Sequence, residues 1–436
     1  MNQKNTHMST EDLKRISTHS HIKSLGLNSV GEPIDIECGV VGQYNAREAC
    51  GIVVELVKNK KMAGRSVLFV GPMGSGKTAL ALALSKDIGS KTPFYTISGS
   101  EVFSTEVKKT EILQEALRKS ILIRFKEIKE IYEGEVVDLN VIEFEDPIKF
   151  YKKTIKEIII TLKTNKGSKK IKLSPSLYET IEKQRISLGD IVYIESNSGI
   201  IKRLGKCETH KRNYDIEAEC FIPLPKGEVL RRKEIIQEVT LHDLDISTSK
   251  PNGNDVVSIL SQIFNPKKSE ITEKLRNEVN LNVNRYLECG NADVIPGVLF
   301  IDEAHMMDLE CFTFLHKAIE SPFSPLIVFS SNKLKSKIRG SKNIENHFGM
   351  PKELLDRLVI IPLQKNTTEI NKKILQIRIN EECINVSSEA LTFLSDIAES
   401  KGLRYVLCIL PVLKVFKTKI ERNHVEEVTS LFIGLK

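Results

Sequence analysis

The sequence predicts an α/β protein in which a parallel β-sheet carries a phosphate-binding loop, a β-rich domain is inserted, and a helical domain follows. Three observations predict it. An apolar strand, a glycine-rich loop and a helix follow one another from residue 66 to 84. From about 125 to 230, apolar and polar residues alternate with the period of two that strands show. From 364 onward, the apolar spacing is that of helices.

The bulk composition fits a globular protein with several domains. The chain has 436 residues, of which 28% are charged and 41% hydrophobic. The net charge of +7 permits nucleic-acid binding but does not require it. Eight scattered cysteines without a C-x-x-C pair predict a reducing compartment and no zinc site. No apolar run reaches the ~18 residues of a membrane span, so we expect no membrane partner and a cytosolic or nuclear location.

The first part of the chain leads to the phosphate-binding loop. Residues 1–30 are polar and predict an arm, in which His19 and His21 form at most a weak metal signal. The segment Asn45–Met62 has one apolar face and predicts a helix. Val67–Val70 then predicts a buried strand.

The eight residues after this strand match the pattern G-x-x-x-x-G-K-[ST]. They are Gly71, Pro72, Met73, Gly74, Ser75, Gly76, Lys77 and Thr78. The glycines let backbone N–H groups converge, and with the positive end of the next helix these donors hold a triphosphate. Lys77 would reach the β- and γ-phosphates, and the Thr78 hydroxyl would ligate Mg²⁺. The predicted ligands are therefore ATP and Mg²⁺.

The middle of the chain predicts the insertion. A helix is expected over Glu111–Ile128 after a strand at Phe94–Ile97, and alternating strands follow. This pattern indicates a small barrel. Nine lysines lie between residues 149 and 172, with Glu157 as the only acid there: Lys149, Lys152, Lys153, Lys156, Lys163, Lys166, Lys169, Lys170 and Lys172. They would form either a DNA-binding surface or a solvated strand face.

A second nucleotide signature follows at residues 296–305. The apolar strand Val298–Ile301 ends in Asp302 and Glu303, at the carboxyl edge where parallel sheets bind ligands. Asp302 would hold Mg²⁺, and Glu303 would polarise the attacking water. The strand Leu326–Phe329 leads to Asn332, which would touch the γ-phosphate or that water.

Helices are expected over residues 231–290 and again from 364 to the end, and two arginines stand near these regions. Arg357 precedes a buried strand, where it is either an arginine finger for a neighbouring subunit or half of an ion pair. Arg404 opens a helix, where it either contacts phosphate or is solvated. The predicted divisions are an arm at 1–30, core at 31–124, inserted domain at 125–293, core at 294–364 and helical lid at 365–436.

These elements, in this order, resemble an AAA+ ATPase, and longer strings resemble the RuvB-like AAA+ proteins of eukaryotes. Among these strings are residues 20–27, 42–50, 60–65, 99–111, 132–136, 224–227 and 239–245. The strings Arg47–Cys50 and Ser104–Glu111 favour the first of the family's two paralogous branches over the second, reptin.

The resemblance implies more than the residues alone. The insertion would be an OB-like domain that binds DNA, and Val41, Gly42 and Gln43 would line the adenine pocket, with His19 and His21 near it. Arg357 and Arg404 would be the arginine finger and the second sensor. Members form hexameric rings, often with reptin, and carry a helicase activity. They serve in nuclear chromatin-remodelling, histone-exchange, histone acetyltransferase and chaperone complexes for ribonucleoprotein assembly.

Two functions therefore remain open, and the sequence argues against a third, a GTP-dependent switch. The chain is either a ring-shaped ATP-driven motor on DNA or a nucleotide-gated scaffold that holds protein partners. Guanine selectivity normally uses N-K-x-D, and the only candidate, Asn332–Lys335, ends in lysine instead of aspartate.

Overall fold

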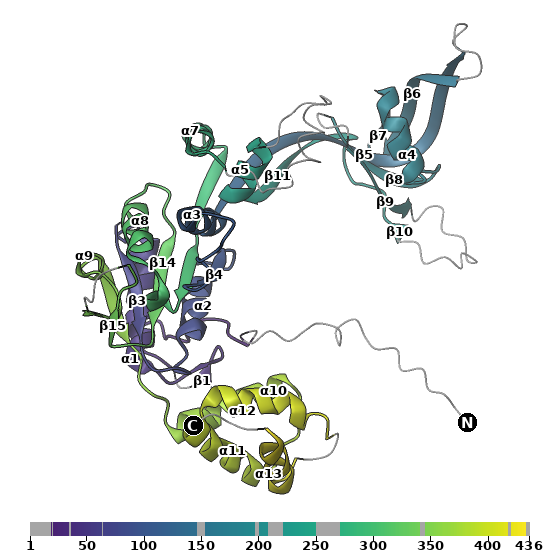
Figure 1. Cartoon of the computed structure of the whole chain (residues 1–436). Helices are drawn as coiled ribbons and strands as arrows, with labels where there is room; N and C mark the ends of the chain where they lie inside the picture. Colours follow the sequence, from purple (N-terminus) through teal and green to yellow (C-terminus); the bar gives the residue numbers. More distant parts are fainter. Residues whose placement is uncertain are drawn as a thin grey trace, which may run out of the picture. The chain divides into compact units, whose positions relative to one another are not determined.

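A computed structural model gives the fold shown in Figure 1. It describes residues 19, 21–34, 36–62, 64–145, 153–196, 200–207, 221–249, 271–340, 345–416 and 420–432. These divide into two compact units: one comprises residues 1–123, 239–285 and 294–436, and the other comprises 124–238 and 286–293. The expected inserted domain, 125–293, is thus divided, because residues 239–285 belong to the first unit.

The centre of the first unit is a five-stranded parallel sheet, as the sequence predicts. Its order is β17-β3-β14-β13-β4, with β17 at Leu358–Pro362, β3 at Ser66–Val70, β14 at Leu326–Ser331, β13 at Val298–Asp302 and β4 at Phe94–Ser98. β3, β13 and β14 are mostly apolar and buried because both faces of the sheet are covered, whereas β4 and β17 are only partly buried.

Alternate strand residues face two helical layers. On one face, Val67 and Phe69 pack with α1 (Tyr44–Lys58) and α2 (Lys77–Ile88). On the other face, Leu68 and Val70 pack with α3 (Lys109–Lys119), α8 (Leu309–Ile319) and α9 (Lys352–Leu355). This three-layer arrangement leaves the carboxyl edge of the strands as the place where loops can converge.

The second unit is rich in β-structure, as expected. Its strands pair in the order β10-β9-β8-β5-β6-β7, and β11 and β12 also pair with β5. The bounds are β5 Ile121–Glu145, β6 Lys153–Thr164, β7 Gly167–Leu173, β8 Asp190–Glu195, β9 Ile201–Cys207, β10 Phe221–Ile222, β11 Leu230–Thr240 and β12 Ala292–Pro296. A 3₁₀ turn at Pro175–Leu177 and α4 (Tyr178–Lys183) pack on it.

Parts of two expected helices are strands in the structure. The helix predicted over Glu111–Ile128 ends at Lys119, and β5 begins at Ile121. The helix predicted from residue 231 is β11, and helices begin only with α5 (Leu241–Ser249) and α7 (Glu273–Glu288). A few apolar residues scattered among charges fit either period over such short segments, and strand pairing within the sheet decides for the strand.

The helical lid is confirmed. It consists of α10 (Thr368–Glu381), α11 (Ser388–Lys401), α12 (Leu403–Leu413) and α13 (Arg422–Leu431) around their own apolar core. The side chains of Thr367 and Ser387 cap α10 and α11 by accepting backbone N–H bonds. Within the described residues, no helix is long and apolar enough to cross a membrane.

Candidate active site

The carboxyl edge of the central sheet gathers six of the predicted site residues into one small cleft. The phosphate loop follows β3, Asp302 ends β13, and Asn332 follows β14. Arg404, from the first turn of α12, reaches the same cleft. The lining side chains are Met73, Lys77, Asp302, Glu303, Ser330, Asn332 and Arg404.

The backbone of the phosphate loop has the conformation that its glycines allow. Gly74 and Gly76 have φ of +79° and +92°, a region that is strained for other residues. Lys77 Nζ folds back over the loop and donates to the carbonyl oxygens of Gly71, at 3.0 Å, and Pro72, at 2.8 Å. Partial burial lowers the pKa of Lys77, although the Asp302 carboxylate acts to raise it. A phosphate would replace these carbonyls with a charged partner.

The two acidic residues are held in different orientations. Asp302 Oδ1 accepts hydrogen bonds from Ser330 Oγ at 2.7 Å and from the Glu303 N–H at 3.0 Å. Glu303 has φ +50° and ψ +46°, the left-handed region, which costs a non-glycine residue about 1–2 kcal/mol. Gly99 makes room for this turn, because a Cβ at Gly99 would lie 2.6 Å from the Glu303 carbonyl oxygen.

Asn332 supplies a polar atom without a partner. Its Oδ1 is buried and has no hydrogen-bond partner within the described part of the chain. Leaving such an acceptor unsatisfied costs about 1–3 kcal/mol, which a water or another donor in the cleft would remove. The site thus fits a polar ligand with bound water.

The residues expected around the adenine lie beside the lid. Val41 belongs to the short hairpin of β1 (Ile36–Glu37) and β2 (Val40–Val41), and Gly42 approaches the Ile370 side chain of α10. Gln43 binds the linker between β17 and α10 through hydrogen bonds to Gln364 and Asn366. This side of the site is therefore built from both the core and the lid.

The two histidines lie next to each other, with ring centroids 6.5 Å apart. Burial lowers the pKa of His19, and the charges of His21, Arg378 and Arg404 lower it further. Burial and Arg378 also lower the pKa of His21, which Glu381 opposes. Both rings thus favour the neutral form. No cluster of three or more His, Cys, Asp or Glu side chains suited to a metal occurs among the described residues.

For Mg²⁺, Thr78 and Asp302 provide oxygen ligands at adjacent ends of α2 and β13. This small set suits Mg²⁺, which commonly takes one or two protein oxygens and completes its shell with waters and substrate phosphates. The buried acceptor of Asn332 in the same cleft also fits a hydrated ion and its substrate.

Arg357 lies outside this cleft. Its guanidinium forms an ion pair with Glu320 at the end of α8, and this bond lowers the pKa of the Glu320 carboxyl. Of the two roles predicted for Arg357, arginine finger or half of an ion pair, the ion pair is therefore present within this chain. An action on a neighbouring subunit stays a prediction, because it needs a second chain.

Sequence reasoning missed four residues of this region. They are Ser330, Gln364, Asn366 and Arg378. Ser330 could have been found, because it is a polar residue at the carboxyl end of a central strand. The other three belong to no motif, and only the fold brings them to the site.

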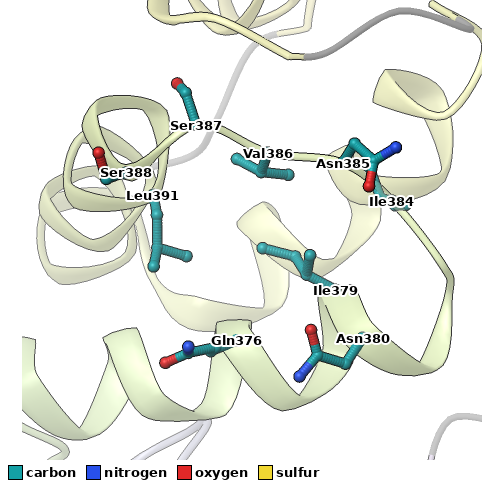
Figure 2. A pocket seen from close by; sticks show the side chains of 9 residues that line it. All are labelled: Gln376, Ile379, Asn380, Ile384, Asn385, Val386, Ser387, Ser388 and Leu391. Carbon is teal, nitrogen blue, oxygen red and sulfur yellow. The ribbon is translucent and has the colours of Figure 1, made fainter.

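A larger pocket lies within the lid, between the end of α10 and the start of α11 (Figure 2). Its volume is about 540 Å³, and its lining consists of Gln376, Ile379, Asn380, Ile384, Asn385, Val386, Ser387, Ser388 and Leu391. None of these side chains is ionisable, so the lining supplies no acid–base group and no charged partner for a phosphate. The smaller cleft at the sheet edge is the candidate active site.

Comparison with known proteins extends these observations. A model of the TIP49 P-loop domain matches residues 15–369, and one of the TIP49 AAA-lid domain matches residues 374–434. RuvB-like protein 1 of Encephalitozoon cuniculi is 54% identical over 417 residues, which cover 96% of this chain and 98% of the relative. RuvB-like helicase 1 of Drosophila melanogaster is 48% identical, covering 98% and 95%. RuvB-like protein 1 of Arabidopsis thaliana is 46% identical, covering 98% and 94%. All three names carry the number 1, in agreement with the expected first branch.

Proposed function

The chain belongs to the TIP49 family of RuvB-like AAA+ proteins, and we propose that it is an ATPase of the helicase class that works as a ring. The observation that carries the proposal is the convergence of Lys77, Asp302, Glu303, Asn332 and Arg404 on one cleft.

The proposed reaction is the hydrolysis of ATP to ADP and phosphate. The loop N–H groups and Lys77 would bind the phosphates, and Arg404 would contact them from the lid. Thr78 and Asp302 would hold Mg²⁺, which would neutralise charge on the phosphates. Glu303 would orient and polarise the attacking water, with Asn332 Oδ1 as a second acceptor for it. Asp302 would instead serve Mg²⁺, with its Oδ1 oriented by the hydrogen bonds from Ser330 and the Glu303 N–H.

The decisive experiment replaces Glu303 with Gln. This variant keeps the side chain's size but removes its ability to accept a proton, so we expect ATP to bind normally. Turnover should fall about 10²–10⁴-fold. ATP affinity and single-turnover hydrolysis should be measured on the same preparation.

The matched control is Glu310→Gln, which removes an exposed carboxylate on α8 without touching the cleft. Its turnover should equal that of the unmodified protein. Near-normal hydrolysis by Glu303→Gln would remove Glu303 from the proposed role.

The second candidate function is a nucleotide-gated scaffold, and the insertion provides an observation in its favour. The described lysines of β6 and β7 do not form one basic surface. Lys163, Lys170 and Lys172 share the outer face of the hairpin, because they alternate with the buried Leu162 and the half-buried Ile171. Lys172 is paired there with Glu157 at 3.4 Å.

Lys169 lies on the opposite face, where its Nζ is 5.4 Å from the centre of the Tyr132 ring. The side chains of Lys149, Lys152, Lys153 and Lys156 lie outside the described residues. ATPase stimulation separates the two functions. Stimulation by DNA together with directional unwinding supports the motor, and stimulation by protein partners alone supports the scaffold.

The ring, its partners and its location complete the proposal. A hexamer, alone or alternating with the reptin paralogue, would place Arg357 of one subunit at the cleft of the next. A nuclear role in chromatin and ribonucleoprotein assembly, with a cytoplasmic pool, fits the family. Native mass measurement with and without the paralogue would decide the composition of the ring.

A further inference from the structure

A set of hydrogen bonds connects the base side of the cleft to the linker that leads into the lid, and its linker residues Gln364 and Asn366 belong to no recognised motif. Gln43 Oε1 accepts from the Gln364 N–H at 3.1 Å, and Gln43 Nε2 donates to the Gln364 carbonyl at 2.6 Å. The Gln43 side chain thus pairs with the linker backbone as a neighbouring strand would. We call Gln43, Gln364 and Asn366 the linker latch.

The latch continues to the phosphate loop through Asn366. Asn366 Oδ1 accepts from Gln43 Nε2 at 3.2 Å, and Asn366 Nδ2 donates to the Gly74 carbonyl at 3.4 Å. One half-buried amide therefore links the base side with the loop that would bind phosphates. Gly74 has φ +79°, so the direction of its peptide group is set by an unusual backbone conformation.

The backbone around the latch supports its specific geometry. Gln43 itself has φ +51° and ψ +43°, a left-handed conformation that directs its side chain away from α1 and toward the linker. The Leu363 N–H donates to the Val70 carbonyl at 2.7 Å, which fixes the start of the linker at the end of β3. The linker then leads into α10, which is capped by Thr367, and Arg404 follows within the same lid.

We propose that Gln43 and Asn366 are positioning residues for nucleotide binding. The linker latch holds the phosphate loop and the lid in the arrangement that ADP and ATP require before either arrives. The latch touches the Gly74 carbonyl and not the position of the reacting water. It therefore contributes equally to substrate and transition state, which raises affinity without changing the rate of the chemical step. This inference rests on the proposed nucleotide site.

The test measures dissociation constants for ADP and ATP by calorimetry, together with kcat and KM, in the full-length protein. Gln43→Ala removes three hydrogen bonds of the latch and Asn366→Ala removes two. Because these bonds act on the nucleotide only indirectly, each variant should weaken the binding of ADP and of ATP about fivefold, as much as one neutral hydrogen bond contributes. KM should rise with kcat unchanged within about twofold. The double variant should bind nucleotide more weakly than either single variant. Its loss of affinity should nevertheless be smaller than the product of the two single losses, because both residues belong to one network.

Lys365→Ala is the matched control, because this exposed neighbour lies between the two linker residues and its substitution leaves the latch intact. Its affinities should match the unmodified protein. Asn366→Asp, nearly equal in size to asparagine, keeps the acceptor for Gln43 but loses the donation to Gly74. It should bind at least as weakly as Asn366→Ala, and it serves if the alanine variant fails to fold.

The proposal would be overturned if Asn366→Asp or Asn366→Ala bound ADP and ATP as tightly as the unmodified protein. It would also be overturned if the losses of affinity multiplied fully in the double variant. A fall in kcat with unchanged KM would overturn it as well. Failure of the unmodified protein to bind ADP or ATP would instead overturn the proposed function, so the two results are distinguishable.

Discussion

At the scale of single residues, Arg357 forms an ion pair within its own chain that is weak enough to be exchanged for another partner. Its partner Glu320 is more than half exposed, and both groups remain in contact with water. Ion pairs of this kind contribute little to stability, with a typical value of about 0–1 kcal/mol. The pair is therefore weak enough to be exchanged for the proposed contact between Arg357 and a phosphate of a neighbouring subunit.

Mixing two inactive variants tests this action between subunits. Arg357→Ala lacks the arginine, and Lys77→Ala lacks the phosphate-binding lysine. In an equal mixture, about one interface in four would combine an intact Lys77 with an intact Arg357, so ATPase activity should return in part. Steady-state hydrolysis measured against the mixing ratio checks this.

The control for the mixture is Arg357→Lys, which keeps a positive charge beside Glu320 but loses the planar fork of arginine. It should remain as inactive as the alanine variant. An activity that stays at the level of the separate variants across all mixing ratios would count against a role between subunits.

At the scale of elements, a buried network joins α3, α5 and α7 of the first unit. Arg118 on α3 donates to both carboxylate oxygens of Asp245 on α5, with Nη2 and Oδ1 2.5 Å apart. Arg118 Nη1 also donates to Asn280 Oδ1 on α7, at 2.9 Å. Asp245 is fully buried and Arg118 nearly so. The three helices are therefore held together by charge as well as by apolar packing.

Asp245→Leu should destabilise the protein by about 3–5 kcal/mol, because it leaves the Arg118 charge buried without its partner. Chemical denaturation measures this free energy of unfolding. The double variant Arg118→Leu/Asp245→Leu removes both charges and should lose clearly less. Equal losses in the single and double variants would mean that packing, and not charge pairing, dominates this site.

The β6–β7 hairpin is the second element whose role can be tested. The exposed Lys163, Lys170 and Lys172 share its outer face, so they are the described lysines that could bind a DNA backbone together. Changing all three to Gln should reduce the dependence of DNA affinity on salt by about 2–3 units of logarithmic slope. Fluorescence anisotropy with duplex and single-stranded DNA at several salt concentrations measures that slope.

Lys58, Lys60 and Lys61 offer a control with the same change of charge in the first unit, where all three are exposed. Replacing them with Gln should leave the slope unchanged. If the hairpin variant retains the full slope, this surface makes no contact with DNA phosphates and the scaffold function gains support.

At the scale of the whole molecule, four histidines link stability to pH. They are His19, His21, His242 and His305. The pKa of each lies below the ordinary value of about 6.5, and burial is the main cause. The folded state therefore favours neutral rings. On acidification, the unfolded chain takes up protons first.

Because the pKa values are lower in the folded state, the contribution of these histidines to the free energy of unfolding should be fully present above about pH 7. It should fall as the pH drops through 6.5 toward the lower pKa values of the folded state. Thermal unfolding between about pH 7.5 and 5.5 should show a steady loss of Tm. His19→Gln together with His21→Gln should make the loss shallower, because two of the four groups are removed. A Tm that is constant or rises over this range would contradict the prediction.

The sequence by itself determined the central sheet, the phosphate loop, the two acidic residues and the helical lid. Each is a local pattern, in which neighbouring residues fix the backbone and its chemistry. The tertiary structure alone decided that residues 121–128 and Leu230–Thr240 belong to strands and not to helices, because their partners lie far along the chain. It also decided the partner of Arg357 and the linker latch, whose Gln43 and Gln364 are 321 residues apart. Contacts between such distant residues depend on how the elements pack, and no periodicity or motif encodes them.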